Sequence, residues 1–148
     1  MVITMFDSIL VICTGNICRS PIGERILRNT LPSMLIDSAG TGALIDRPAD
    51  ESAIQIAQKY NINLDGHKAR QFTAEMGRQY DLLLVMEQYH IEKVSRIAPE
   101  VRGKTMLLGH WMGGREIPDP YRKSNEAFDS VFRLIDQCCK HWADKLGR

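Results

Sequence analysis

The sequence predicts an α/β fold with a central four-stranded parallel sheet flanked by helices. Short apolar runs without alternation, which are typical of strands covered on both faces, occur at 8–13 and 81–86. Segments with helical spacing lie between such runs, and no repeat of roughly 20–50 residues competes with this interpretation. Ligands in such sheets bind at the carboxyl ends of the strands, so the residues that follow the strands are the first candidates for a site.

In the first half of the chain, two strands and two helices are expected. Residues 8–13 form the first strand, 34–38 a second short strand, and 39–42 a turn. Ser20 can cap a helix that Pro21 enters in its first turn and Leu31-Pro32 ends. Asp50 opens another helix that ends at Asn61. Its apolar face comprises Ala53, Ile54, Ile56, Ala57 and Tyr60.

The second half continues the alternation. Thr73 caps a short helix, 81–86 is a third strand, helical spacing runs over 91–98, and 105–108 is a fourth strand. Residues 109–123 show no periodicity, and a segment of this length without secondary structure is usually functional. The last helix carries one apolar stripe, which comprises Phe128, Val131, Phe132, Ile135 and Trp142.

Composition limits the class of protein. The chain has 148 residues, of which 44% are apolar and 25% charged, so we expect one globular domain over 1–148. With 19 basic and 18 acidic residues, the net charge of +1 provides no large field for nucleic acid or an anionic membrane. The run at 8–13 is too short to insert into a membrane. Four cysteines are too few for a disulfide scaffold, which favours the reducing cytoplasm.

The loop after the first strand combines a cysteine with an anion site. It runs from Cys13 to Ser20 and leads into a helix, so backbone N–H groups and the helix dipole point at one place. Gly15 and Asn16 are residue types that tolerate the positive φ of a tight cradle. A thiol beside a helix N-terminus and a guanidinium ionises readily, so we expect Cys13 to be a thiolate near neutral pH. Arg19 can clasp two phosphoryl oxygens, and Ser20 can donate to the sulfur. A structural cysteine followed by a surface arginine is the alternative.

Asp119 is the candidate for a general acid. Pro118 and Pro120 stiffen the backbone around it and so limit where its carboxyl group points. It can protonate a leaving oxygen and later activate water to hydrolyse a cysteinyl-phosphate. An isolated Asp-Pro pair is typical of a turn, so the catalytic interpretation depends on the cysteine loop.

The chain resembles the low-molecular-weight protein tyrosine phosphatases along nearly its whole length. The resemblance is carried by Cys13-Thr14-Gly15-Asn16-Ile17-Cys18-Arg19-Ser20-Pro21, by Ser38-Ala39-Gly40 and by Asp119-Pro120-Tyr121. Segments 101–111 and 116–124 are most similar to bacterial members that pair with a tyrosine autokinase in capsule and exopolysaccharide export. The resemblance implies the three-layer αβα fold of phosphotyrosine protein phosphatase I.

The resemblance also implies roles for individual residues. Cys13 is the implied nucleophile, Arg19 the phosphate clamp and Asp119 the general acid. The phosphate-binding loop comprises Thr14, Gly15, Asn16, Ile17, Cys18 and Ser20, and the hydrogen-bond network that supports it adds Ser38 and His67. Cys18 matches a cysteine that can form a reversible disulfide with the nucleophile, and a small apolar filler is the other interpretation. Tyr121 and Leu44 are the expected substrate walls, although animal members have an aromatic residue at the position of Leu44.

The expected substrate is phosphotyrosine in a protein, in particular the cytoplasmic tail of a membrane tyrosine autokinase, and the chemistry needs no cofactor or metal. Four cationic residues either surround the mouth of the site and favour acidic phosphopeptides or are solvated surface charges: Arg47, Arg115, Arg122 and Lys123.

Three other functions fit the sequence less well. Arsenate reduction needs resolving thiols near the loop, and 81–99 contains no cysteine. A silent phosphotyrosine-binding module has no need of Asp119. A zinc site lacks partners for Cys13 and Cys18, because Cys138 and Cys139 are adjacent and we expect them to be ordinary helix residues. The remaining histidines, His90, His110 and His141, form no ligand motif.

Overall fold

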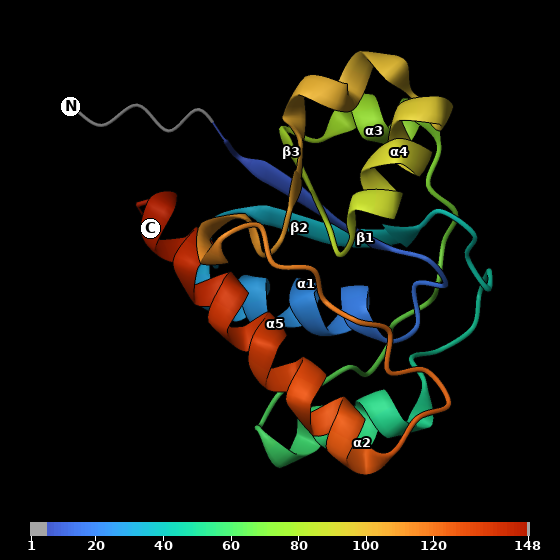
Figure 1. Ribbon diagram of the computed structural model, residues 1–148, viewed down its shortest axis with the longest axis vertical. Helices are drawn as coiled ribbons and strands as arrows, with labels where there is room; N and C mark the ends of the chain where they lie inside the picture. Colours follow the sequence, from blue (N-terminus) through green and yellow to red (C-terminus); the bar gives the residue numbers. More distant parts are fainter. Residues whose placement is uncertain (1–5, 148) are drawn as a thin grey trace.

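The computed structural model describes residues 6–147, and Figure 1 shows a central sheet with helices on both of its faces. Of the predicted domain at 1–148, residues 1–5 and 148 lie outside the described part. The strands are β1 (Ser8–Cys13), β2 (Leu35–Gly40), β3 (Leu82–Val85) and β4 (Thr105–Leu107). They are parallel and lie in the order β2-β1-β3-β4, which confirms the predicted sheet.

The helices form two layers around this sheet. One face is covered by α1 (Arg19–Thr30), α2 (Glu51–Lys59) and α5 (Asn125–Lys145). The other face is covered by α3 (Ala74–Gln79), α4 (Gln88–Ile97) and the 3-10 helix η1 (Pro99–Lys104). The three-layer αβα architecture is therefore confirmed. None of the helices in the described residues is long and apolar enough to cross a membrane.

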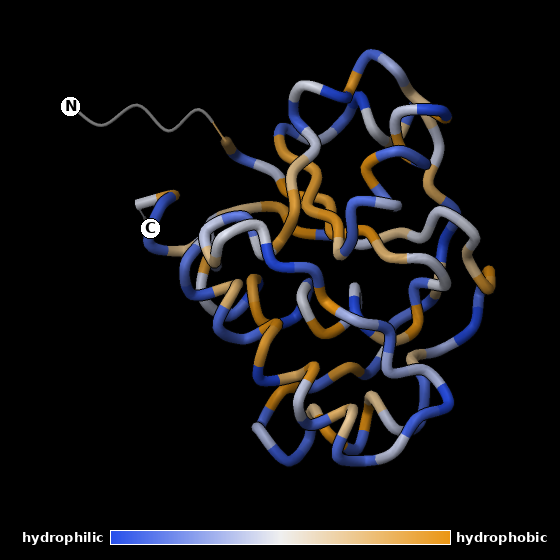
Figure 2. Tube along the Cα trace, viewed as in Figure 1, coloured by the Kyte–Doolittle hydropathy of each residue, from blue (hydrophilic) through white to orange (hydrophobic). Residues whose placement is uncertain are grey.

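Strand β1 shows why its sequence is apolar without alternation. Ile9 and Val11 belong to the core cluster under α1 and α5, whereas Leu10 and Ile12 belong to the cluster under α4. Successive side chains of a strand point to opposite faces, so a strand between two helical layers buries every residue. In Figure 2 the central strands are drawn largely in the hydrophobic colour.

Two predicted helix starts, at Asp50 and Thr73, agree with the structure, and a third cap lies at Ser124, where the sequence predicted a helix without a defined start. The Asp50 side chain accepts from the Ser52 N–H, the Thr73 hydroxyl from the Met76 N–H, and the Ser124 hydroxyl from the Ala127 N–H. These bonds satisfy N–H groups that lack partners within the helix. The predicted stripe of α5 is buried throughout, since Phe128, Val131, Phe132, Ile135 and Trp142 are each at most 4% exposed.

The predicted cap at Ser20 is wrong. Helix α1 begins at Arg19 with Cys18 at the N-cap position, and no side chain caps it. Ser20 lies inside the first turn, where its hydroxyl bonds to other side chains of the preceding loop. The local sequence resembles a capped helix start, but the hydroxyl has tertiary partners that determine its position.

Three further features differ from expectation. Strand β2 continues through Ala39 and Gly40, which the sequence assigned to a turn, because Cys13 pairs with Gly40 in the register of β1 and β2. The 109–123 segment contains a 3-10 helix, η2 (His110–Met112), and a bridge between Gly109 and Arg115. The sequence also gave no sign of η1.

Candidate active site

The loop from Cys13 to Cys18 leaves β1 at the carboxyl edge of the sheet and enters α1. Asn16 has φ 60°, the left-handed conformation that a tight loop requires, whereas Gly15 is not among the residues with positive φ. The loop packs closely on the end of β2: a Cβ at Gly40 would overlap the Thr14 carbonyl oxygen and lie 3.1 Å from the Asn16 nitrogen. Glycine is therefore needed at position 40 to let the loop approach.

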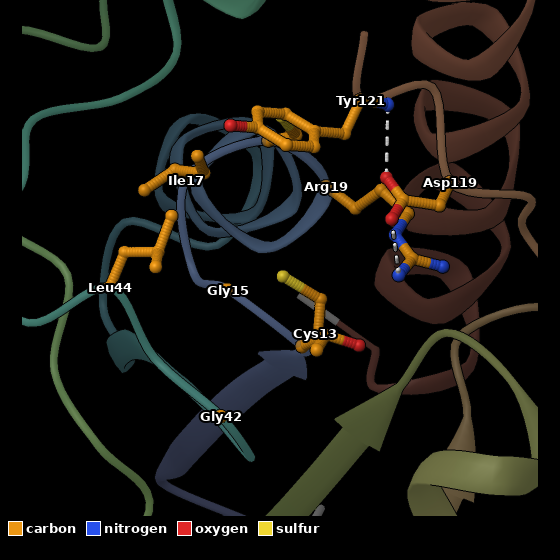
Figure 3. A pocket seen from close by; sticks show the side chains of 10 residues that line it. Cys13, Gly15, Ile17, Arg19, Gly42, Leu44, Asp119 and Tyr121 are labelled. Carbon is orange, nitrogen blue, oxygen red and sulfur yellow. Dashed lines mark hydrogen bonds and ion pairs between the residues drawn. The ribbon is translucent and has the colours of Figure 1, made fainter.

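A cavity of about 200 Å³ opens above this loop. Ten residues line it: Cys13, Thr14, Gly15, Ile17, Cys18, Arg19, Gly42, Leu44, Asp119 and Tyr121. Figure 3 shows the Cys13 sulfur pointing into this space, with Leu44 and Ile17 on one side and Arg19 and Asp119 on the other. The cavity thus brings two thiols, those of Cys13 and Cys18, together with one guanidinium, one carboxyl group and a partly apolar wall.

Arg19 is held rigidly beside the thiol. Its side chain is 2% exposed, and Nη1 donates to Glu87 Oε2 at 2.7 Å and to the Ile117 carbonyl oxygen at 2.8 Å. Neither Glu87 nor Ile117 lines the cavity, and both bonds use Nη1, so Nη2 can bind groups in the cavity. Charge-assisted bonds of this kind fix the plane of the guanidinium.

Asp119 lies above the guanidinium on the segment before α5. Its Oδ1 accepts from the Tyr121 N–H at 3.0 Å, and its Oδ2 lies 3.8 Å from Arg19 Nη2. The side chain is 50% exposed, so water and a ligand can reach it. The carboxyl group is oriented through one oxygen while the other oxygen remains accessible.

Cys13 is 3% exposed, and its sulfur lies 2.9 Å from Ser20 Oγ. The Asn16 amide donates to Ser20 Oγ at 2.7 Å and to Ser38 Oγ at 3.0 Å. His67 Nε2 donates to the Asn16 carbonyl oxygen at 2.5 Å, and burial lowers the pKa of this histidine. The four residues expected to support the loop therefore form one network behind it.

Two residues that follow β3 belong to the site but were not predicted from the sequence. Glu87 binds Arg19, and His90, which is fully buried, lies 2.9 Å from Thr14 Oγ1 through Nε2. The Glu87 N–H donates to His90 Nδ1, so Nε2 carries the proton and donates to Thr14. Burial, followed by the charge of Arg19, lowers the pKa of His90 to about 4. Their position directly after a buried parallel strand was the available signal.

The other cysteines differ from Cys13. Cys18 is 4% exposed, and burial, followed by the charge of Asp50, raises the pKa of its thiol far above the usual range. Cys138 and Cys139 are buried on α5 outside the cavity, and burial raises the pKa of Cys138 to about 11. All four are free thiols. Among residues 6–147 no group of three or more His, Cys, Asp or Glu side chains is placed to hold a metal ion.

The walls of the cavity are apolar and aromatic, whereas the cationic residues expected at its mouth lie outside its lining. Leu44 is 37% exposed, Ile17 is 7% exposed, and both line the cavity with the half-buried Tyr121. The four cationic residues considered for the mouth are exposed and are not among the lining residues. The Arg122 guanidinium lies over the Tyr121 ring, 5.2 Å from its centroid.

Comparison with known proteins agrees with this geometry. The model of the family described as "Low molecular weight phosphotyrosine protein phosphatase" matches residues 8–148. The phosphatase Etp of Escherichia coli K12 is 54% identical, over 97% of this chain and 97% of its own.

Two solved structures are similar. The tyrosine phosphatase Wzb of Escherichia coli K30, in complex with sulphate, is 67% identical with a TM-score of 0.95, over 97% of this chain and 100% of its own. Vibrio vulnificus Wzb, in complex with benzylphosphonate, is 49% identical with a TM-score of 0.93, over 95% of this chain and 99% of its own. The chain therefore belongs to the low-molecular-weight phosphotyrosine protein phosphatase family and is a protein-tyrosine-phosphatase.

Proposed function

We propose that the chain hydrolyses phosphotyrosine in proteins through a phosphocysteine intermediate on Cys13. The observation that carries this proposal is the convergence of the Cys13 sulfur, the buried Arg19 guanidinium and the Asp119 carboxyl group in one cavity. A nucleophile, an anion clamp and a proton donor are the groups that transfer of a phosphoryl group to sulfur requires.

In the first step, the Cys13 thiolate attacks phosphorus while the bond from phosphorus to the tyrosyl oxygen breaks. The non-bridging oxygens are bound by loop N–H groups and by Arg19, which follows them as the group becomes trigonal. Asp119, in its acid form, gives its proton to the departing tyrosyl oxygen, and tyrosine leaves as the neutral phenol. The Ser20 hydroxyl next to the sulfur stabilises the thiolate before attack.

In the second step, the Asp119 carboxylate takes a proton from a water molecule as the water attacks phosphorus. The sulfur–phosphorus bond breaks, the thiolate returns, and inorganic phosphate leaves. Asp119 is then protonated again and ready for the next substrate. The half-exposed position of this carboxyl group suits both roles, because water reaches it directly.

The cavity walls favour an aryl phosphate. Ile17 and Leu44 face Tyr121 across a space that can hold a flat ring. A long phosphotyrosine places its phosphate on the loop at the bottom of this space, whereas a phosphoserine is shorter. The benzylphosphonate bound by the Vibrio vulnificus relative and the sulphate bound by the Escherichia coli K30 relative support the same assignment here.

The proposed protein target is the phosphorylated tyrosine tail of a membrane tyrosine autokinase. This assignment rests on the resemblance carried by 101–111 and 116–124 to bacterial members that act with such kinases. The exposed Arg122 and Lys123 near the cavity suit an acidic phosphopeptide. Release of phosphate from a phosphorylated tail peptide, compared with a neutral phosphotyrosine peptide of the same length, tests this point, and equal rates would reject it.

The mechanism is tested by turnover of para-nitrophenyl phosphate with chelator present. We expect the wild-type protein to retain full activity and Cys13→Ser to lose it, with a phosphorylated Cys13 trapped by rapid acid quench in the wild type. Substantial turnover by Cys13→Ser, or loss of wild-type turnover on chelation, would overturn the mechanism.

A further inference from the structure

Glu24 is a buried carboxylate for which the proposed mechanism gives no role. It lies on α1 with 5% of its surface exposed, behind the phosphate-binding loop and outside the lining of the active-site cavity. Arg25 Nε lies 2.9 Å from its Oε2, and Arg28 Nη2 lies 3.6 Å from its Oε1. Burying a carboxylate is costly, so a hydrogen-bonded carboxylate at this position calls for an explanation.

A continuous chain of hydrogen bonds leads from Glu24 to the active-site sulfur. We call its three middle members, Ser38, Asn16 and Ser20, the serine–asparagine chain. The Ser38 hydroxyl donates to Glu24 Oε1 at 2.9 Å, and the Asn16 amide nitrogen donates to both serine hydroxyl oxygens, at 3.0 and 2.7 Å. Ser20 Oγ then lies 2.9 Å from the Cys13 sulfur.

The donor and acceptor roles along this chain follow from one another. A carboxylate only accepts, so the proton of Ser38 is committed to Glu24 and a lone pair of Ser38 faces Asn16. The Asn16 amide must therefore present its nitrogen to Ser38, and its second N–H occupies a lone pair of Ser20. The hydroxyl proton of Ser20 remains free to point at the sulfur. An ionised sulfur can only accept a hydrogen bond, so the serine–asparagine chain ends with a donor facing the Cys13 thiolate.

Two further features keep the chain in this orientation. The Arg70 backbone N–H donates to Asn16 Oδ1 at 3.0 Å, which opposes a flip of the amide. Ser20 and Asn16 are fully buried and Ser38 is 3% exposed, so water does not replace any of the bonds. Buried networks that are fully satisfied specify one arrangement of their members.

We propose that Glu24 is a positioning residue that sets the direction of the serine–asparagine chain and thereby points the Ser20 proton at the Cys13 thiolate. This inference rests on the proposed role of Cys13 as the nucleophile. It extends the supporting network of the loop to a residue that contacts neither substrate nor the reacting atoms. Its consequence is one directed hydrogen bond to the thiolate in addition to the loop N–H groups and Arg19.

The charges around Glu24 and Cys13 let the direction of the shift in Cys13 reactivity distinguish two explanations. Glu24 is faced by Arg25 and Arg28 from α1, by Asp37 from β2, and by three cationic or titratable residues of one segment, His67, Lys68 and Arg70. Cys13 is faced by Arg19 and by Cys18 and Asp119. If Glu24 acted only as a negative charge through space, its loss would make the Cys13 thiol more acidic. If Glu24 acts through the serine–asparagine chain, its loss makes the thiol less acidic.

The test is the pH dependence of Cys13 alkylation by iodoacetamide, followed on the Cys13 peptide by mass spectrometry. In Glu24→Gln, the amide oxygen is held by Arg25, so the amide nitrogen faces Ser38 and donates to it. Ser38 then loses its acceptor, and the polarity of the chain is no longer enforced. We expect the alkylation midpoint to rise by about one pH unit, a roughly 10-fold loss of thiolate below the midpoint.

Matched variants separate the chain from other effects. Arg28→Gln removes one cation from the same carboxylate but leaves the Ser38 bond. Its midpoint is expected to stay within about 0.3 pH units of the wild type, because the Arg28 guanidinium is 42% exposed and lies 3.6 Å from Glu24 Oε1, so water screens the pair. Ser38→Ala breaks the chain at the next link and should raise the midpoint as Glu24→Gln does. If Glu24 acts through Ser38, the alkylation midpoint of the Glu24→Gln, Ser38→Ala double variant shifts no further than that of Ser38→Ala alone.

An unchanged or lowered midpoint in folded Glu24→Gln, or additive shifts in the double variant, would overturn the proposal. If Glu24→Gln does not fold, neutron diffraction from the wild-type protein decides instead. The Ser38 deuteron is expected on the side of Glu24 and the Ser20 deuteron on the side of Cys13, and the reverse placement of either overturns the inference. Alkylation needs no turnover, so these results stand apart from the test of Cys13 as the nucleophile.

Discussion

Arg19 Nη1 donates to Glu87 Oε2 at 2.7 Å across 68 positions of sequence, and this bond joins the start of α1 to the start of α4. Both residues follow strands that are neighbours in the sheet. Because the guanidinium is buried and Glu87 lies outside the cavity lining, the carboxylate orients Arg19, the proposed phosphate clamp, without entering the cavity.

Substitution of Glu87 should therefore weaken anion binding. Glu87→Gln keeps the shape but replaces a charged acceptor by a neutral one, and we expect the inhibition constant of inorganic phosphate to rise roughly 10-fold. Competitive inhibition of para-nitrophenyl phosphate hydrolysis measures it. Glu92→Gln, an exposed change on the same helix, is the control and should leave the constant unchanged. A wild-type constant in Glu87→Gln would contradict this view of Arg19.

Asp119→Asn should slow poor leaving groups most. An asparagine keeps the size of the side chain but has no acidic proton for the departing oxygen, and general acids contribute roughly 10²–10⁴-fold. We expect phenyl phosphate turnover to fall by about 100-fold or more and para-nitrophenyl phosphate turnover to fall by less. The exposed change Asp144→Asn provides the baseline. Equal losses for both substrates would assign Asp119 a role other than that of the acid.

Gly40→Ala should damage both stability and activity. The added methyl group would overlap the Thr14 carbonyl oxygen, so the loop from Cys13 to Cys18 must shift. Overpacking of this kind costs roughly 1–3 kcal/mol, and urea unfolding measures it. Gly103→Ala is the matched control, because a Cβ there meets nothing within 4 Å. If Gly40→Ala unfolds at the wild-type urea concentration with full activity, the loop does not need this close approach.

Cys18→Ala separates the two interpretations of the second loop cysteine. If Cys18 forms a reversible disulfide with Cys13, peroxide-treated wild-type protein recovers its activity with dithiothreitol, whereas the variant does not. Untreated variant should keep near-wild-type turnover, because burial holds Cys18 as a neutral thiol. Peptide mapping of the oxidised wild type identifies the bond. Full recovery of the variant after oxidation would leave Cys18 as a core residue only.

The pH dependence of stability should carry a contribution from His90. Burial and Arg19 lower its pKa to about 4 in the folded protein, whereas the unfolded chain protonates it near 6.5. The unfolded state therefore binds more protons between these values, and the free energy of unfolding falls as the pH is lowered through this window. Between pH 7 and pH 5 the loss from this group is on the order of 2 kcal/mol.

His90→Gln lacks the titrating group, so its stability should depend less steeply on pH over the same window. Urea unfolding of both proteins at the two pH values measures the difference. Other histidines and carboxylates contribute to both proteins alike and cancel in the comparison. Identical pH dependence of the two proteins would show that His90 is protonated as easily in the folded state as in the unfolded chain.

Local signals in the sequence predicted most of the elements. The apolar run of β1 and the helix starts at Asp50 and Thr73 depend on neighbours within a few residues, and each is present in the structure. Cys13, Arg19 and Ser20 could be grouped in advance for the same reason, because one loop carries them. The cap at Ser20 failed since local preference was overridden by partners elsewhere in the fold.

The layered α/β architecture and the candidate loop from Cys13 to Ser20 could be predicted from the sequence, because burial periodicity and loop chemistry depend on consecutive residues. The tertiary structure alone decided which distant groups meet that loop: Glu87 and the Ile117 carbonyl on Arg19, His90 on Thr14, and Glu24 behind Ser38. These contacts depend on strand order and on the angle at which each helix leaves the sheet, and neither leaves a local pattern. Directed hydrogen bonds between segments far apart in the chain exist only once the sheet has brought them together.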